Sequence, residues 1–224
     1  MGDRFFDERQ RATIVSAMAR IIPTDHEPGA REAGTIDFLD RYLSGIDFIY
    51  AKPDGSGFET LSGLRADAWR KRVEQLRKTY ADGIVELDRR GQARHGRDFT
   101  KLTPEQQDQV LGAMERGEPE TQGVPAVAPA YTLTVAAGSG GAEPALQQTS
   151  TETELPFVPL LALHTRQGFY ADPIYGGNQG QVGWRVIGFP GPASMNDVFT
   201  GRYSTLEWFA EGHNRPARED ENGR

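Results

Sequence analysis

Residues 64–91 read LRADAWRKRVEQLRKTYADGIVELDRRG, which is the longest stretch of the chain with a regular hydrophobic pattern. Apolar side chains recur in it every three or four residues, at Trp69, Val73, Leu76, Tyr80, Ile84 and Leu87, while arginine, lysine and glutamate occupy the positions between them. This spacing is typical of an amphipathic helix that buries one face. We therefore expect one long helix that ends near Gly91, and a fold that is mainly α.

Three further helices are predicted in the first half of the chain. Residues 8–22 follow Asp7, a possible N-cap, and stop at Pro23, and residues 36–44 repeat helically up to Gly45. The third begins at Thr103, where Thr-Pro-Glu-Gln has the pattern of a capping box, and it runs to Gly117. Between the second helix and the long one, residues 46–63 are predicted to form a loop pinned by aromatic side chains.

The composition changes after Gly117. No lysine or arginine occurs between Gly117 and Thr165, and most residues up to Thr153 are Ala, Gly, Pro, Thr or Gln. A low-complexity insertion at the surface fits this text best, although residues 131–135 alternate like a short strand. We expect a helical part over residues 1–117, the insertion over 118–153, a segment over 154–211 that completes the same domain, and a polar tail over 212–224.

Composition also narrows the classes of function. The chain has 224 residues with 25 Lys and Arg against 32 Asp and Glu, so its net charge of −7 disfavours nucleic acids and anionic membranes as partners. It has no cysteine, which excludes disulfides, thiolate metal sites and cysteine nucleophiles. No apolar run is long enough to cross a membrane, and residues 1–8 lack the features of an export signal, so we expect no membrane insertion and a cytoplasmic protein.

No motif indicates a catalytic, cofactor-binding or metal site in this chain. The glycine-rich nucleotide loops and the serine elbow of hydrolases are missing. The four histidines are scattered singly, at His26, His95, His164 and His213. His26, between Asp25 and Glu27, could hold an ion, but such a loop more often caps the next helix. His164 follows an apolar face, so a hydrogen-bonded core histidine is the simpler interpretation.

Two groups of carboxylates could supply an acid and base pair. They are Asp37, Asp40 and Asp47 in one group, and Asp82, Glu86 and Asp88 in the other. On charged helices such residues more often form a solvated face.

The C-terminal third contains the most unusual stretch of sequence. After a buried helix predicted in the segment that begins at Leu155 and ends at Gly168, residues 168–178 read GFYADPIYGGN and residues 183–191 read GWRVIGFPG. Aromatic residues and glycines are both abundant there, and no long helix or regular strand fits. We expect an ordered irregular loop in which glycines permit tight turns and large rings are buried. The whole chain is thus predicted to be an irregular helical domain with long ordered loops and an aromatic, glycine-rich C-terminal loop region.

These two stretches resemble the gluconate 2-dehydrogenase subunit 3 family. Similarity continues upstream at Ile21-Ile22-Pro23-Thr24, at Phe38-Leu39 and at the helix start Leu102-Thr103-Pro104. The resemblance implies a small helical subunit bound to a large FAD-containing oxidoreductase of the glucose-methanol-choline type, in complexes that oxidise sugars, sugar acids or glycosides. Flavin and catalytic residues would belong to the large subunit, with no cofactor in this chain, and a cytochrome c subunit is a further candidate partner.

The resemblance also implies that the subunit assists folding of its partner and, in members with a twin-arginine signal, its export. No twin arginine precedes Phe5 in this sequence. A cytoplasmic complex is therefore the expectation, and a periplasmic one the alternative if such a signal was removed.

The glycine-rich aromatic stretch is our candidate for contact with the large subunit. Its predicted interface residues are Tyr170, Asp172, Pro173, Tyr175, Gly176, Gly177, Asn178, Trp184, Phe189 and Pro190, with the rings as anchors and the glycines allowing close backbone approach. The opposing interpretation is a self-contained loop that packs on its own helices. For the whole chain, the alternatives are a stand-alone carbohydrate-binding module and an independent acid/base enzyme.

Overall fold

The computed structural model describes residues 4–118 and 152–204. These residues form α1 (Glu8–Ile21), α2 (Thr35–Ser44), α3 (Gly63–His95), α4 (Pro104–Glu115), α6 (Phe157–Tyr170), α7 (Val182–Val186) and α8 (Met195–Phe199), joined by loops and 3-10 turns. Within the described ranges no β-strand occurs, and Ala51 and Phe58 form an isolated antiparallel bridge. The predicted mainly α fold is confirmed. Most of the predicted insertion over 118–153, including the strand-like residues 131–135, and the predicted tail over 212–224 lie outside the described residues.

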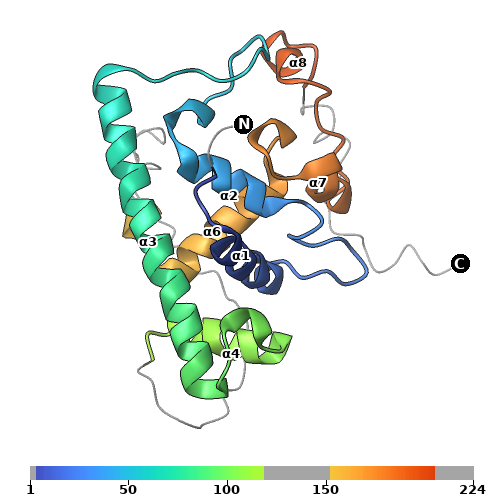
Figure 1. Ribbon diagram of the computed structural model, residues 1–224. Helices are drawn as coiled ribbons and strands as arrows, with labels where there is room; N and C mark the ends of the chain where they lie inside the picture. The colour runs from blue at the N-terminus through green and yellow to red at the C-terminus, as the bar shows by residue number, and fades with distance from the viewer. Residues whose placement is uncertain (1–3, 119–151, 205–224) are drawn as a thin grey trace, which may run out of the picture.

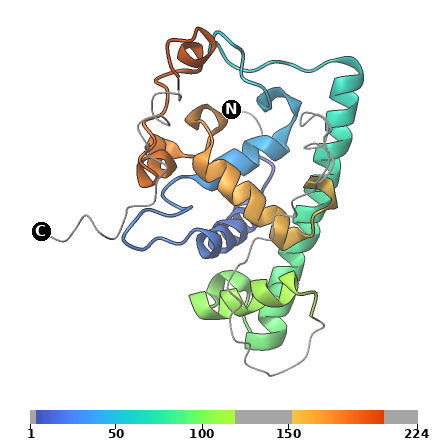
Figure 2. The ribbon, with the colours of Figure 1, turned by 180° about the vertical axis from the view of Figure 1, so that it is seen from behind.

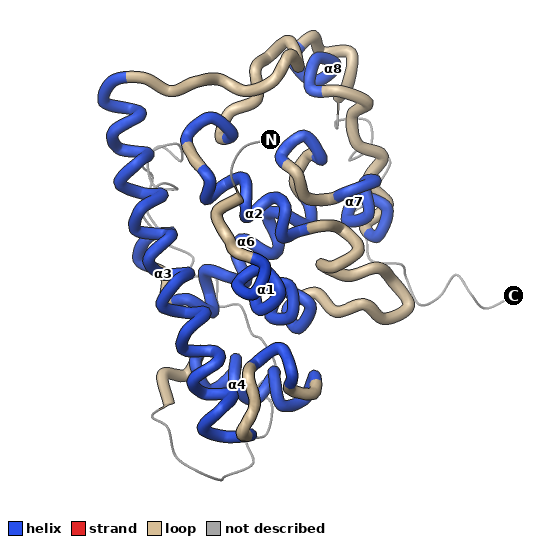
Figure 3. The backbone as a smooth tube through the Cα atoms, viewed as in Figure 1, coloured by secondary structure: helices blue, strands red, loops and turns tan. Residues whose placement is uncertain are grey.

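The helices are arranged around α6. It crosses the centre of the molecule and contacts α1, α2, α3 and α4 (Figure 1). The long α3 forms one side, and α4 packs near its C-terminal end. Seen from behind, α7 and α8 lie on the side opposite α3 (Figure 2). Long loops connect the helices at that end, and the loop that precedes α3 runs up to the α8 region (Figure 3). No helix in the described part of the chain is long and apolar enough to span a bilayer.

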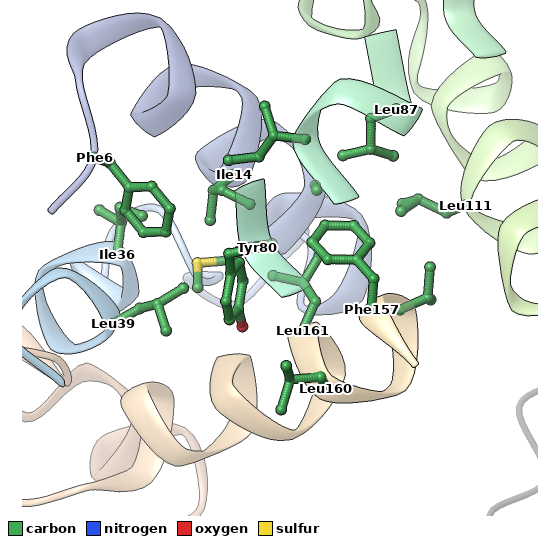
Figure 4. Close-up of a cluster of buried hydrophobic side chains, with 14 of the residues drawn as sticks. Phe6, Ile14, Ile36, Leu39, Tyr80, Leu87, Leu111, Phe157, Leu160 and Leu161 are labelled. Carbon is green, nitrogen blue, oxygen red and sulfur yellow. The ribbon is translucent and has the colours of Figure 1, made fainter. Parts of the chain in front are cut away.

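One large hydrophobic cluster joins the helices before and after residues 119–151. Ile14 of α1, Leu39 of α2, Tyr80 of α3 and Leu161 of α6 are each almost fully buried in it (Figure 4). Burying one such side chain contributes roughly 1.5–3 kcal/mol. Helices from both parts of the chain therefore depend on a shared core.

Two helix starts follow the signals in the sequence. Asp7 caps α1 and exchanges hydrogen bonds with Gln10, and Thr103 caps α4 and exchanges them with Gln106. Each pair satisfies backbone N–H groups that the first helical turn leaves without a partner. Both predicted N-termini are confirmed.

Replacing Thr103 by alanine should lower the free energy of unfolding by about 1 kcal/mol, because the Gln106 N–H would lose its acceptor at the start of α4. Thr103→Ser, which keeps the hydroxyl, should stay within about 0.5 kcal/mol of the unchanged chain. Urea unfolding followed by circular dichroism measures both. Equal losses in the two variants would show that the hydroxyl does not stabilise α4.

Two predicted helix ends are wrong. The prediction ended the long helix near Gly91, but α3 continues to His95 and stops at Gly96, which has a left-handed backbone (φ 67°). Gly91 lies inside the helix and does not end it. A glycine is needed there because a Cβ would come within 2.7 Å of the Arg97 carbonyl oxygen. Likewise α6 continues through Gly168 to Tyr170. Gly168 lacks a side chain because Phe38 packs against its backbone. The short helices α7 and α8, in text expected to be irregular, were not predicted.

Candidate functional site

The aromatic and glycine-rich residues 168–191, here called the signature segment, begin within the last turn of α6. A first 3-10 turn spans Pro173–Tyr175, a second spans Gln179–Gln181, and α7 follows. The expected ordered loop is therefore a series of short turns that leads into a five-residue helix, and residues 187–191 follow that helix.

Asn178 holds the turns of this segment together. Its side chain is fully buried, its Nδ2 donates to the Ala171 carbonyl at 2.8 Å, and its Oδ1 accepts from the Gly183 amide at 2.7 Å. The backbone of Asn178 is left-handed (φ 47°), a conformation that asparagine tolerates better than most residues. One side chain thus connects the end of α6 to the start of α7.

Glycine allows α7 to approach α6 closely. A Cβ on Gly183 would overlap the carbonyl oxygen of Phe169 and lie 2.9 Å from its ring. Trp184, the next residue, is 5% exposed and donates from Nε1 to the Tyr170 carbonyl at 2.7 Å. Its ring meets that of Phe189 edge to face, with centroids 5.4 Å apart. Gly183 and Trp184 of the signature segment therefore pack against α6 and other residues of this chain.

Side chains from α2 and the turns tie the segment to the rest of the fold. Gln179 donates from Nε2 to Asp37 at 2.6 Å, and its amide donates to the Ala33 carbonyl at 2.9 Å. Arg41 donates to the Ile174 carbonyl at 3.0 Å. The segment thus has a fixed position against α2.

The predicted interface residues fall into two groups. Gly177, Asn178 and Trp184 are buried and hold the segment together. Accessible surface remains on Tyr170, Asp172, Pro173, Tyr175, Gly176, Phe189 and Pro190, of which Tyr170 and Pro190 are the most exposed. Their contact with a partner remains a prediction, but only the second group has side chains or backbone at the surface to make it.

A pocket of about 440 Å³ opens beside the start of the signature segment. We call it the aromatic pocket, and its lining residues are Phe38, Tyr42, Phe48, Ile49, Gln167, Tyr170, Ala171 and Tyr175. It brings together two predicted interface residues, Tyr170 and Tyr175, with the loop after α2. The sequence predicted that aromatic side chains pin this loop, but it did not indicate a pocket there.

A second hollow, of about 290 Å³, lies between Pro173 and the residues before α8. Asp172 and Pro173 of the predicted interface line it, together with Gly55 from the loop before α3. The signature segment therefore separates two depressions.

A chain of polar side chains is buried behind the aromatic pocket. The Tyr80 hydroxyl lies 2.7 Å from His164 Nδ1, and His164 Nε2 lies 2.5 Å from Glu152 Oε1. The other carboxylate oxygen of Glu152 pairs with Arg72 and accepts from the Tyr42 hydroxyl at 3.2 Å. We call these five residues the buried network. Tyr42 belongs both to this network and to the wall of the pocket.

Electrostatics explains which protonation states the network favours. Burial alone would raise the pKa of Glu152, but the hydrogen bond and charge of His164 and the Arg72 guanidinium outweigh it and hold that pKa below its ordinary value. Burial and the nearby Glu152 charge raise the pKa of Tyr42 and of Tyr80 well above 10. Glu152 is therefore a carboxylate at neutral pH, and both tyrosines keep their hydroxyl protons.

The buried network has the residue types of an acid/base site but not the access of one. Both Tyr80 and His164 have no exposed surface, so a substrate cannot reach the imidazole. The network instead binds residues 152–154 to α3, assisted by Gln75, which donates to the Thr153 carbonyl at 3.0 Å. The interpretation of His164 as a hydrogen-bonded core histidine is confirmed, whereas Glu152 was missed.

Most of the carboxylates proposed as acid and base also have structural partners. Asp40 is buried, accepts from the amides of Phe5 and Phe6 at 3.0 Å, and pairs with Arg11 at 2.6 Å. The interpretation of Asp40 as part of a solvated face was wrong, because its carboxylate is buried and accepts hydrogen bonds from the backbone just before α1.

Asp88, in the C-terminal part of α3, has a similar role. It is buried and accepts from the Phe99 amide at 3.0 Å, while Arg9 pairs with its second oxygen at 2.5 Å. Asp82 is exposed and pairs with Lys78, and Glu86 pairs with Arg89 and Arg90 on the same helix. Hydrogen bonds from Arg89 lower the pKa of Glu86 to about 2.

The loop around His26 is closed by its own residues. The Asp25 carboxylate accepts from the Glu27 amide at 2.9 Å, and Thr24 donates to Glu32 at 2.7 Å. The expected cap of the next helix is wrong, since the N-cap of α2 is Gly34. Over the described ranges, no three His, Asp or Glu side chains gather as a metal site.

The sequence that forms the signature segment and the helices around it matches a known protein family. The sequence profile described as gluconate 2-dehydrogenase subunit 3 matches residues 8–191. The chain belongs to this family. Searches among curated proteins and among solved structures gave no match. A subunit 3 implies partner chains, so membership of the gluconate 2-dehydrogenase subunit 3 family indicates a protein that works in a complex.

Proposed function

We propose that this chain is the non-catalytic small subunit of an FAD-dependent dehydrogenase complex. It binds and stabilises a large oxidoreductase of the glucose-methanol-choline type that oxidises sugars or glycosides, and FAD and the catalytic groups belong to that subunit. The observation that carries the proposal is the family match over residues 8–191, which includes the whole signature segment.

The distribution of exposed apolar side chains supports a partner-binding role. Among the large hydrophobic residues that the structure shows exposed, five lie in the loop before α3, at the last residue of α6 or beyond it: Tyr50, Tyr170, Ile187, Val198 and Phe199. Leu64 and Val85 are the others, both on α3. Exposed apolar surface gathered in particular segments is typical of an interface. The signature segment is thus the natural centre of the contact.

The state of the polar groups supports a non-catalytic role. His164, Glu152, Asp40 and Asp88 are buried and hydrogen-bonded to other parts of the chain. Each of them stabilises a helix, a turn or a chain entry. Acid/base chemistry in this complex is therefore assigned to the large subunit.

Co-expression tests whether the chain stabilises its partner. We expect the large flavoprotein partner to give at least about fivefold more soluble, flavin-loaded protein with the chain than without it, because a partner that binds only the folded state shifts the folding equilibrium. The readouts are soluble yield and flavin absorbance per mole of protein. Equal yield, flavin content and dehydrogenase activity without the chain would overturn the proposal.

A further inference from the structure

We propose that the aromatic pocket receives one uncharged, ring-bearing side chain from the large flavoprotein subunit, and that this contact anchors the complex. The inference rests on the proposed function and gives it a defined point of contact. It places the anchor at the junction of α2, the end of α6 and the first turn of the signature segment.

The chemistry of the lining selects an uncharged occupant. Its walls are the rings of Phe38, Tyr42, Phe48 and Tyr175 with Ile49 and Ala171, and no lining residue carries a charge. A charged group would lose its hydration there without gaining an ion pair. The Gln167 amide at the edge can exchange a hydrogen bond with an indole N–H or a phenol. An aromatic side chain therefore fits the pocket better than an aliphatic or an ionic one.

The walls of the pocket are already fixed before a partner arrives. The rings of Phe38 and Tyr42 are stacked with centroids 5.8 Å apart, and the Tyr42 hydroxyl donates to Glu152 in the buried network. The Tyr175 hydroxyl accepts from the Ala51 amide at 3.3 Å, and its ring meets Phe58 edge to face. A preformed pocket costs little ordering entropy on binding, which is the property of an interface hot spot.

Position points to the large subunit as the source of the side chain. Tyr170 and Tyr175 line the pocket and also belong to the signature segment matched by the family of dehydrogenase subunits. Tyr170 and Tyr50, each 42% exposed, extend the apolar surface outward from this end of the molecule. A volume of about 440 Å³ lies near the lower end of the roughly 300–1,000 Å³ that small-molecule sites occupy. It can accept a single ring-bearing side chain.

Two substitutions test the anchor from opposite directions. Gln167→Trp places an indole at the edge of the pocket from an exposed position of α6, and Tyr170→Ala removes a wall that is partly exposed. Val85→Ala, which alters an exposed apolar residue on α3, is the matched control. Biolayer interferometry with the purified flavoprotein gives the dissociation constants, and thermal melts check that each variant is folded. We expect at least tenfold weaker binding for both pocket variants and less than a twofold change for the control.

The outcomes separate this inference from the proposed function. Failure of the unchanged chain to bind the flavoprotein would overturn both. Binding by the unchanged chain with equal affinity in folded Gln167→Trp would overturn the anchor alone. If the pocket variants lower dehydrogenase activity but not affinity, the pocket holds a small molecule. If they only abolish self-association, it holds a second copy, and either result rejects the anchor. Should Tyr170→Ala unfold, Gln167→Trp decides the question.

Discussion

Replacing Glu152 by leucine should lower the free energy of unfolding by about 3–5 kcal/mol. Glu152 is the common partner of Arg72, His164 and Tyr42, and its side chain is only 6% exposed. Without the carboxylate, the Arg72 guanidinium loses its charged partner in a site where it is 13% exposed, and the His164 Nε2 atom loses its hydrogen bond. Removing one member of a buried ion pair costs more than the pair contributes, because the other charge stays buried.

Glu154 provides the control for this substitution. It belongs to the same 3-10 turn but is exposed to solvent. Glu154→Leu should therefore change the stability by less than about 0.5 kcal/mol. Guanidinium unfolding monitored by tryptophan fluorescence compares the two variants. A loss below about 1 kcal/mol for Glu152→Leu would mean that the buried network does not hold residues 152–154 on α3.

The same network makes stability depend on pH. The folded-state pKa of Glu152 lies below its ordinary value of 4.5, so its carboxylate stabilises the fold fully above that value. This contribution falls as the pH drops below about 4.5 and the carboxylate becomes protonated. Glu152→Gln should thus be less stable than the unchanged chain at pH 7, and the difference should shrink toward pH 3.

Replacing Gly183 by alanine should lower the free energy of unfolding by about 2–3 kcal/mol. The added methyl group would overlap the carbonyl oxygen of Phe169, which is backbone and cannot rotate away. Relief requires α7 to move from α6, which would lengthen the hydrogen bond from the Gly183 amide to Asn178 and the one from Trp184 to the Tyr170 carbonyl. Both the stability and the shape of the signature segment should therefore change.

Gly45→Ala separates this steric effect from the general effect of losing a glycine. Gly45 has an extended backbone, and a Cβ added there would meet no other atom within 4 Å. Alanine at such a site is neutral or stabilising by up to about 1 kcal/mol, because it restricts the unfolded chain. Thermal and urea unfolding of the two variants should move in opposite directions or differ by at least about 2 kcal/mol. Similar behaviour of both would contradict the close approach of α7 to α6.

Helix positions were predictable wherever the signal is local. The capping boxes at Asp7 and Thr103 involve residues three apart, and the buried face of α3 repeats in the sequence itself. Two helix ends predicted at glycine were wrong, because Gly91 and Gly168 lie inside helices, whereas the end of α2 at Gly45 was predicted correctly. Each of these two glycines leaves room for another part of the chain to pack closely. For Gly168 the packing residue is Phe38, which is far away in the sequence, so the sequence gives no local sign of the contact.

The candidate site could be predicted only in part from the sequence, because some of its contacts join residues that are far apart in the chain. Glu152 lies at the edge of low-complexity text, and its partners Arg72 and Tyr42 are 80 and 110 residues away. Nothing local marks it as the centre of the buried network. Within the signature segment, the sequence could not distinguish rings that pack inward, such as Trp184, from rings that line a pocket, such as Tyr170 and Tyr175.

Size-exclusion chromatography of the co-expressed pair, with light scattering for mass and absorbance read at the flavin band, tests whether this chain is the small subunit of the flavoprotein. We expect one peak that contains both chains, carries the flavin absorbance and has the summed mass of a complex. Elution of this chain alone, with an active flavoprotein in a separate peak, would contradict the assignment of the chain as its small subunit.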